Sequence, residues 1–446
     1  MESPAKRSPL VIALPWLVWS VLAARLLARY DRISVDLFFW DEWDYRTGFF
    51  EGASAWQLFD WQHGPHRMGL GNLIARGLYE LTRWNVRAEA LAAALCYIAA
   101  AALAVALVQR LCGPSQWNAL VPLCVLTGLL ADSAASVPNL SHGPLPLVLV
   151  LLFAWAMVAL RGSARLISLL VLDFLALFTG FGLVLAPLTR GLLLLWTVFP
   201  PNDSAGLHSR WPPLLALLAS SVGPALFMQG YLFAPAVECF IFPHPHPSEY
   251  LSFASLLLER PLGISGVGGL RALVAFGTPL LEAGALLVAL VAAYRTHGVD
   301  PRALAVILLT LFSFSFAALT AVGRVCLGID AAAATRYVPY ALPALLALVV
   351  AIRAWAPAVL QPRALGALLA VFVVKEALVS LRPIRETTLL VDGKQRSREC
   401  LLDRAGDAAI CERESGFALH PNPTATRLQE KLDWLRAQRL GPFRDR

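Results

Sequence analysis

Reactive side chains gather in one polar stretch near the start of the chain. Asp41, Glu42 and Asp44 lie within the aromatic segment 38–45. Aromatic rings at a membrane surface partly shield a carboxylate from water, which raises its pKa toward the range useful to a general base. We interpret the three acids as candidate catalytic groups, with Asp41 or Glu42 as the base. The alternative is an acidic loop that pairs with neighbouring arginines and does no chemistry.

A second polar motif, His63, His66 and Arg67, follows in the same segment. The His-x-x-His spacing could bind a metal ion, but no third ligand has a fixed spacing from it. The planar guanidinium of Arg67 matches the oxygens of a phosphate group. The motif therefore predicts a substrate-binding site, and we expect it to work without a metal or other cofactor.

A third group, Arg324, Arg336 and Tyr337, lies late in the chain on either side of a short loop that contains Asp330. Two arginines that bracket such a loop between apolar runs lie at the depth of lipid headgroups, where they suit an anionic phosphate. Ordinary anchoring at the membrane interface would give the same pattern. We include the three residues as candidate substrate-binding groups.

The elements that position these groups are apolar. Of the 446 residues, 58% are hydrophobic and 15% are charged, whereas soluble domains carry roughly 25% charged residues. Repeated apolar runs of about 20 residues fit a bilayer. The sequence therefore predicts an all-α, polytopic membrane protein. The net charge of +7 comes from arginines at helix ends, which set topology and meet anionic lipid, so we expect no nucleic-acid partner.

We expect about eleven spans. Lys6 and Arg7 before the first span favour a cytoplasmic N-terminus, although arginines also follow that span. Residues 31–87 then form a long first extracytoplasmic loop, with an interfacial helix over 70–81. The expected spans are 10–28, 88–108, 117–130, 147–160, two within 166–199 separated near Gly180, 214–233, 270–294, 303–322, 337–355 and 364–381.

The last part of the chain changes character. Residues 1–381 form the expected transmembrane domain, and the charged tail 382–446 follows it. An odd number of spans puts this tail outside, where Cys400 and Cys411 could form a disulfide worth roughly 3 kcal/mol. Two free thiols in a cytoplasmic tail are the alternative. Leu428, Leu432 and Leu435 indicate a short amphipathic helix in the tail.

Some ionisable residues fall outside these motifs. Asp173, Lys375 and Glu376 lie within apolar runs, where such groups are costly and indicate a functional role. Lys375 and Glu376 are adjacent, so each should seek its own partner. His244 and His246 lie between prolines and are typical of plain loop residues.

The arrangement resembles the GT-C superfamily of polytopic glycosyltransferases, and is most similar to bacterial members. The resemblance rests on the long acidic first loop and on four short motifs, namely Trp40 to Trp43, His63 to Arg67, Arg336-Tyr337 and Gly441 to Arg444. It covers the whole chain as an architecture. It implies location in the plasma (inner) membrane and transfer of a sugar from a polyprenyl-phosphate donor to a glycan or lipid acceptor of the cell envelope.

The resemblance also implies a mechanism. Asp41 or Glu42 would take the proton of the acceptor hydroxyl, which would attack and invert the anomeric carbon, and Arg324, Arg336 or Arg67 would stabilise the departing phosphate. One rival is a lipid-linked glycan polymerase or ligase, which would tend to have its long loop late in the chain. A non-enzymatic transporter or flippase and a structural membrane component are the others. Loss of function in an Asp41→Asn variant would separate enzyme from non-enzyme.

Overall fold

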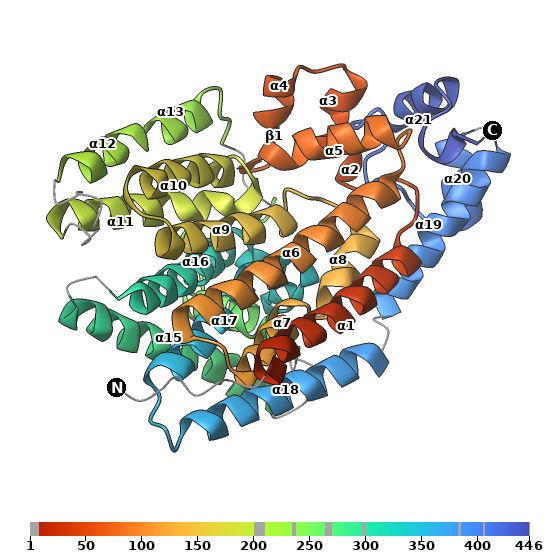
Figure 1. Cartoon of the computed structure of the whole chain (residues 1–446). Coiled ribbons are helices and arrows are strands. Elements are labelled where there is room, and N and C mark those ends of the chain that lie inside the picture. Colours follow the sequence, from red (N-terminus) through yellow and green to blue (C-terminus); the bar gives the residue numbers. More distant parts are fainter. Residues whose placement is uncertain are drawn as a thin grey trace.

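The computed structural model describes residues 9–199, 210–233, 238–263, 270–296, 300–381, 385–404 and 406–445. These parts of the chain are almost entirely helical (Figure 1). The strands within them are β1 (Gln62–His63) and β2 (His66–Arg67), an antiparallel hairpin that pairs His63 with His66. The fold is therefore the expected all-α one.

Twenty-one α-helices make up the described chain. They are α1 (Pro9–Ile33), α2 (Glu42–Tyr45), α3 (Thr47–Phe50), α4 (Ala55–Phe59), α5 (Gly69–Leu81), α6 (Val86–Cys112), α7 (Leu120–Val125), α8 (Leu129–Ser136), α9 (Pro144–Ala159), α10 (Gly162–Leu177), α11 (Leu185–Val198), α12 (Trp211–Ala219), α13 (Val222–Met228), α14 (Ser248–Glu259), α15 (Leu270–Arg295), α16 (Pro301–Arg324), α17 (Val338–Trp355), α18 (Gln361–Leu381), α19 (Arg385–Asp403), α20 (Ala408–Ser415) and α21 (Leu428–Ala437).

Seven helical segments among the described residues are long and apolar enough to cross a membrane. They contain α1, α6, α11, α12 with α13, most of α15, α16 and α17. The chain is thus a polytopic helical membrane protein. Fewer segments meet these criteria than the expected number of about eleven, because several apolar stretches are shorter or broken. Residues 116–136 divide into a 3-10 turn, α7 and α8, and α9 has only 16 residues.

The centre of the helical bundle is α17. In its most apolar window 78% of the residues are buried, compared with 22% for α1, which lies at the edge. Helices α6, α9 and α16 pack against α17, and their alanine and leucine side chains form one continuous apolar core with it. Helix α16 ends next to this core and α17 begins next to it. The core therefore positions both ends of the loop between them.

A separate layer, which we call the cap, covers one end of the bundle. It consists of residues 34–85 and the described part of 385–445, so α2 to α5 lie beside α19 to α21 (Figure 1). It has its own apolar core, which contains Phe38 and Trp43 of the first loop and Leu419 and Leu432 of the tail. The first loop and the tail therefore lie on the same side of the membrane.

Helix α5 confirms the helix expected over 70–81, but its orientation differs from a simple interfacial helix. Asn72, Ala75 and Tyr79 are its fully buried residues, whereas Leu81 is 84% exposed. Leu70 and Leu78 are half-buried against the transmembrane core. The helix thus lies between the rest of the cap and the bundle, and the pattern of leucines alone did not indicate which face would be covered.

Two disulfides form among the described residues. Cys400–Cys411 joins α19 to α20, with Cα atoms 5.5 Å apart. Cys239–Cys326, which the sequence did not suggest, joins the segment before α14 to the turn after α16, with Cα atoms 5.8 Å apart. The free cysteines Cys96, Cys112 and Cys124 lie in the helical bundle.

Candidate active site

The residue before Asp41 in the acidic segment has a left-handed backbone conformation. Trp40 has a φ of 55°, a conformation that non-glycine residues seldom adopt. Asp41 follows at the N-terminal end of the short helix α2, but its side chain makes no capping hydrogen bond. Its carboxylate is therefore free to point away from the helix, and its side chain is 52% exposed.

Asp41 faces a cavity of about 360 Å³ between the cap and the bundle. The walls come from separate parts of the chain: the end of α1, the acidic segment, the hairpin, α6, the loop before α9 and the start of the α17 segment. The lining residues that can make polar contacts are Tyr30, Trp40, Asp41, Tyr45, His63, Tyr97, Asn139, His142 and Arg336. The cavity thus joins three groups of residues that are far apart in sequence.

The carboxylate of Asp41 lies among positive or protonatable groups. Its Oδ2 is 3.9 Å from Nε2 of His63. Burial alone would raise the pKa of Asp41, but the interaction with His63 and the charges of Arg336 and His142 outweigh burial, so the pKa is lowered. The expectation of a raised pKa for this acid is therefore wrong. Asp41 is ionised at neutral pH and can accept a proton directly.

Glu42 has the opposite environment. Its side chain is fully buried in the cap, where Oε2 accepts a hydrogen bond of 2.8 Å from the Phe39 backbone N–H and lies 3.9 Å from Nζ of Lys394. Burial raises the pKa of Glu42 to about 8, against the influence of Lys394. Glu42 does not line the cavity. Two adjacent acids therefore have different surroundings and different charges at neutral pH.

Asp44 also points away from the cavity. Its Oδ2 is 3.0 Å from Nε2 of His420 in the tail. The structure thus brings Asp41, but not Glu42 or Asp44, to the lining of the cavity. The other two acids contact the tail.

The two histidines of the hairpin lie in different surroundings. His63 lines the cavity, while His66 is buried against Phe181, with ring centroids 3.9 Å apart. Burial, together with the charges of His63 and Arg324, lowers the pKa of His66 to about 3. His66 is therefore neutral, and its ring lies 5.2 Å from that of His142.

The guanidinium of Arg67 is hydrogen-bonded to other parts of the protein. Its guanidinium donates hydrogen bonds to three carbonyl oxygens, those of Asp60 at 2.7 Å, Phe227 at 2.7 Å and Gln229 at 2.8 Å. It ties the hairpin to the end of α13 and is 3% exposed. In this conformation Arg67 holds the fold together, and no donor is directed at the cavity.

Arg324 and Arg336 are close enough to Asp41 for their charges to interact with it. Arg336 lines the cavity and donates to the hydroxyl of Tyr337 at 3.4 Å, while the Tyr337 ring is buried. No ion pair with a carboxylate is found for either arginine within the described parts of the chain. Their charge is thus available to an anionic ligand.

Sequence reasoning missed the residues that support this site. Arg46 and Glu89 form a fully buried ion pair, and Glu89 also accepts from the Tyr79 hydroxyl and, at 3.1 Å, from the backbone N–H of Leu140. This network fixes the first loop to α6 and to the loop that carries His142. A charged residue at the start of the α6 span was the available signal, since such a group seeks a buried partner.

The remaining candidates lie elsewhere. Asp173 pairs with Arg190 at 3.1 Å, and Glu376 pairs with Arg25 and, at 3.0 Å, with Lys375. The expectation that Lys375 and Glu376 would each have a separate partner is therefore wrong for Lys375. His244 lies 3.7 Å from Glu249 and outside the cavity lining. Among the described residues, no group of three or more His, Cys, Asp or Glu side chains is arranged to hold a metal ion.

Comparisons with known proteins give one structural likeness. No protein-family model matches the chain, and no curated protein matches it. Among solved structures it is similar to the crystal structure of ArnT from Cupriavidus metallidurans bound to undecaprenyl phosphate, with a TM-score of 0.44 and 17% sequence identity. The match covers 97% of this chain and 77% of that one. A likeness at this level does not assign the chain to a family.

Proposed function

We propose that the chain is a membrane glycosyltransferase that moves a sugar from a polyprenyl-phosphate donor to a glycan or lipid acceptor of the cell envelope. The observation that carries the proposal is the cavity itself. It combines an ionised carboxylate, Asp41, with Arg336 and the nearby charge of Arg324, at the boundary between cap and bundle. A base and a cation on one small cavity suit the transfer of a group away from a phosphate.

The arginines would bind the phosphate of the donor. A polyprenyl-phosphate sugar carries its phosphate at headgroup depth and its sugar toward water. On this proposal, the cap meets the bundle at that depth. Arg336 lines the cavity, and in the described chain it has only the Tyr337 hydroxyl as a hydrogen-bond partner. As the phosphate leaves, its negative charge increases, so a nearby guanidinium stabilises the transition state more than the bound donor.

Asp41 would act as the general base. An acceptor hydroxyl gives its proton to the Asp41 carboxylate while its oxygen bonds to the anomeric carbon. The bond from that carbon to the phosphate oxygen breaks, its electron pair leaves with the polyprenyl phosphate, and the anomeric configuration is inverted. His63, with Nε2 3.9 Å from Asp41, would orient the carboxylate. Glu42 is the less suitable base because it is buried in the cap.

The disulfides support an extracytoplasmic cap. Cys400–Cys411 lies in the cap, and Cys239–Cys326 includes the residue two positions after Arg324, on the same side of the bundle. Disulfides persist in oxidising compartments, whereas thiols stay reduced in the cytoplasm. A cap outside the cytoplasm favours a lipid-linked donor over a nucleotide sugar, and it implies the cytoplasmic N-terminus expected from the charge distribution.

The test uses membranes from cells that express the full chain. They are given polyprenyl-phosphate hexoses and pentoses with radiolabelled sugars, and label in envelope lipid and glycan is counted. We expect transfer from one donor by the native chain and about 10² to 10⁴-fold less by Asp41→Asn. The control is Asp31→Asn, an exposed acid that pairs with Arg87 outside the cavity. Equal transfer by both variants would refute the role of Asp41.

The same experiment separates the rival functions. A polymerase or ligase would transfer oligosaccharide but not single sugars. A transporter or flippase would move the lipid-linked sugar across the membrane without labelling any acceptor, and its function would survive Asp41→Asn. No transfer of any donor by the native chain would therefore reject the glycosyltransferase proposal.

A further inference from the structure

We propose that the C-terminal tail is a positioning element of the Asp41 site: residues 417–431 hold the backbone around Asp41 so that its carboxylate faces the cavity. This inference rests on the proposed function for its catalytic meaning, but the geometry that it describes can be tested without any reaction. The tail would then be a working part of the site, contributed from the far end of the chain.

The first support is the strained residue before the base. Trp40 has a φ of 55°, and non-glycine residues keep such a conformation only where the surroundings impose it. Its backbone N–H donates a hydrogen bond of 2.8 Å to the carbonyl oxygen of Leu419. The tail therefore fixes the peptide that sets the direction of the Asp41 side chain.

The second support is the set of contacts on the neighbouring residues. The Phe39 ring stacks on Phe417 with centroids 5.1 Å apart. The Asp44 carboxylate meets His420 at 3.0 Å. The ammonium of Lys431 donates to the Trp43 carbonyl oxygen at 2.5 Å.

Lys431 also links the tail to the next helix. It donates to the hydroxyl of Thr47 in α3 at 2.8 Å and to that of Thr426 in the tail at 3.2 Å. Its positive charge lies at the C-terminal end of α2, where the helix dipole favours a cation. One side chain thus holds the end of the short helix that Asp41 begins.

Asp41 itself is the exception. Within the described chain, each other residue of 39–44 contacts the tail, since Glu42 adds the ion pair with Lys394 at 3.9 Å. The Asp41 carboxylate instead lies 3.9 Å from His63 and interacts electrostatically with the cavity groups Arg336 and His142. The tail therefore holds the segment on both sides of the base and leaves the base free.

The tail is anchored well enough to impose this geometry. Arg444 forms an ion pair with Asp36, and the Gly441 N–H donates to the Arg83 carbonyl oxygen at 2.9 Å. The Cys400–Cys411 disulfide ties α19 to α20. We assign Asp41 as the catalytic residue, and His420 and Lys431 as positioning residues that act through the backbone of 40–44.

The experiment measures hydrogen–deuterium exchange of the full chain in lipid nanodiscs. In Lys431→Met and in the milder His420→Asn, we expect amides 40–46 to exchange at least ten times faster, with amides of α5 and α6 unchanged. The control is Asp433→Asn, because Asp433 contacts Arg436 and Gln429 of its own helix. Unchanged exchange at 40–46 in both tail variants would overturn the proposal, as would faster exchange spread over the whole cap.

Transfer kinetics supply the second measurement. A displaced base lowers kcat, whereas the KM for the polyprenyl-phosphate donor stays within twofold because Arg324 and Arg336 are untouched. A variant that changes KM and leaves kcat unchanged would contradict positioning. If the native chain transfers no sugar, the proposed function fails, and the exchange experiment still decides whether the tail holds the segment.

Discussion

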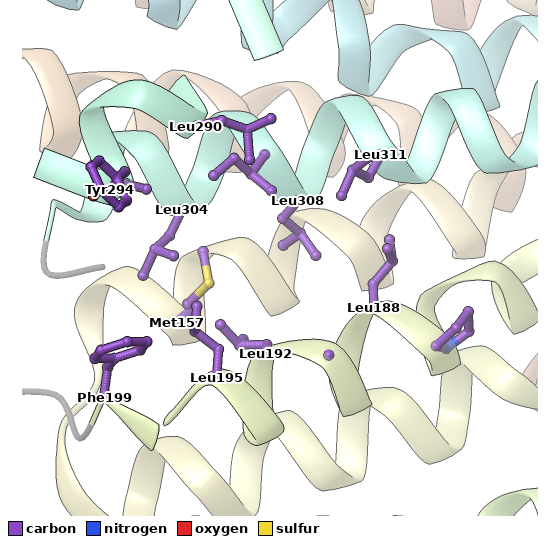
Figure 2. Close-up of a pocket in the computed structure, with 14 residues that line it drawn as sticks. Met157, Leu188, Leu192, Leu195, Phe199, Leu290, Tyr294, Leu304, Leu308 and Leu311 are labelled. Atoms are coloured by element: carbon purple, nitrogen blue, oxygen red, sulfur yellow. The ribbon is translucent and has the colours of Figure 1, made fainter. Parts of the chain in front are cut away.

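Two hollows in the molecule differ in almost every physical property. The Asp41 cavity, about 360 Å³, lies under the cap and is lined by a carboxylate, histidines, tyrosines and an arginine. A second pocket, about 480 Å³, lies between α11, α15 and α16 and is lined by apolar side chains such as Leu192, Leu195 and Leu308 (Figure 2). Apart from Tyr294, the described residues that line the larger hollow are apolar, and none of them is an acid, a histidine or an arginine.

The two hollows lie toward opposite ends of α16. The apolar pocket uses Leu304 to Leu311, near the start of that helix, while Arg324 ends it. From Leu308 to Arg324 the helix rises by roughly 24 Å, most of the thickness of the hydrocarbon core. Volume therefore does not distinguish the cavity that contains reactive groups. Charged side chains converge on the Asp41 cavity under the cap, whereas mainly apolar side chains line the pocket between α11, α15 and α16.

The largest expected effect is on the base in the polar cavity. Asp41→Asn keeps the size of the side chain but cannot accept the proton, so we expect sugar transfer to fall by about 10² to 10⁴-fold. Measurement of kcat with the labelled donor checks this result. A fall of less than tenfold would mean that another group is the base and would weaken the distinction between the two hollows.

The cations of the polar cavity come next. Arg336→Gln removes a donor from the lining, and we expect a loss of about 10²-fold in transfer because the departing phosphate is less stabilised. Arg404→Gln is the matched control, since Arg404 forms an exposed pair with Glu414 at 3.0 Å. Equal transfer rates for the two variants would contradict the binding of the donor phosphate in this cavity.

The contact of the tail with Asp44 should have a smaller effect. Asp44→Ala and His420→Ala each break the same 3.0 Å contact, so we expect each to lower kcat by roughly tenfold, with the double variant no worse than either. Additive losses would indicate that Asp44 acts independently of the tail. That result would restore Asp44 as a separate catalytic candidate.

Glu42 gives a prediction about stability and pH. Its pKa is about 8 in the folded protein and 4.5 when unperturbed. The folded state therefore binds more protons between these values, and its stability falls as the pH rises from 4.5 to 8. We expect the Tm of the native chain to decrease between pH 5 and pH 8, and to decrease less in Glu42→Gln. A Tm difference between the two proteins that does not change with pH would contradict this assignment.

The smallest effect is expected in the apolar pocket. Leu195→Trp fills part of it with another apolar side chain, and we expect transfer to change by less than twofold. Among the described residues, its lining contains no acid, histidine or arginine that could act on a sugar. A strong loss in this variant, with normal expression, would show that the pocket takes part in the reaction and would overturn the contrast drawn between the two hollows.

Much of the architecture could be predicted because it depends on local patterns. Composition indicated a polytopic helical protein, and the break near Gly180 separates α10 from the segment of α11 as expected. Periodicity indicated α5 and α21. The spacing of Cys400 and Cys411 allowed the disulfide that the structure contains. The number of spans was harder to predict, because short apolar helices and true spans have the same composition.

Residue types alone show which side chains could act, whereas the packing of the folded chain sets which of them lie together. Asp41 and Glu42 are adjacent, but successive residues of a helix point about 100° apart, so one faces the cavity and the other enters the cap. An arginine such as Arg67 is a residue type that suits a phosphate site, yet its guanidinium donates hydrogen bonds to three carbonyl oxygens of the protein. The role of His420 depends on a contact across 376 residues, and no local pattern encodes such a contact, because it forms only when the tail docks on the first loop.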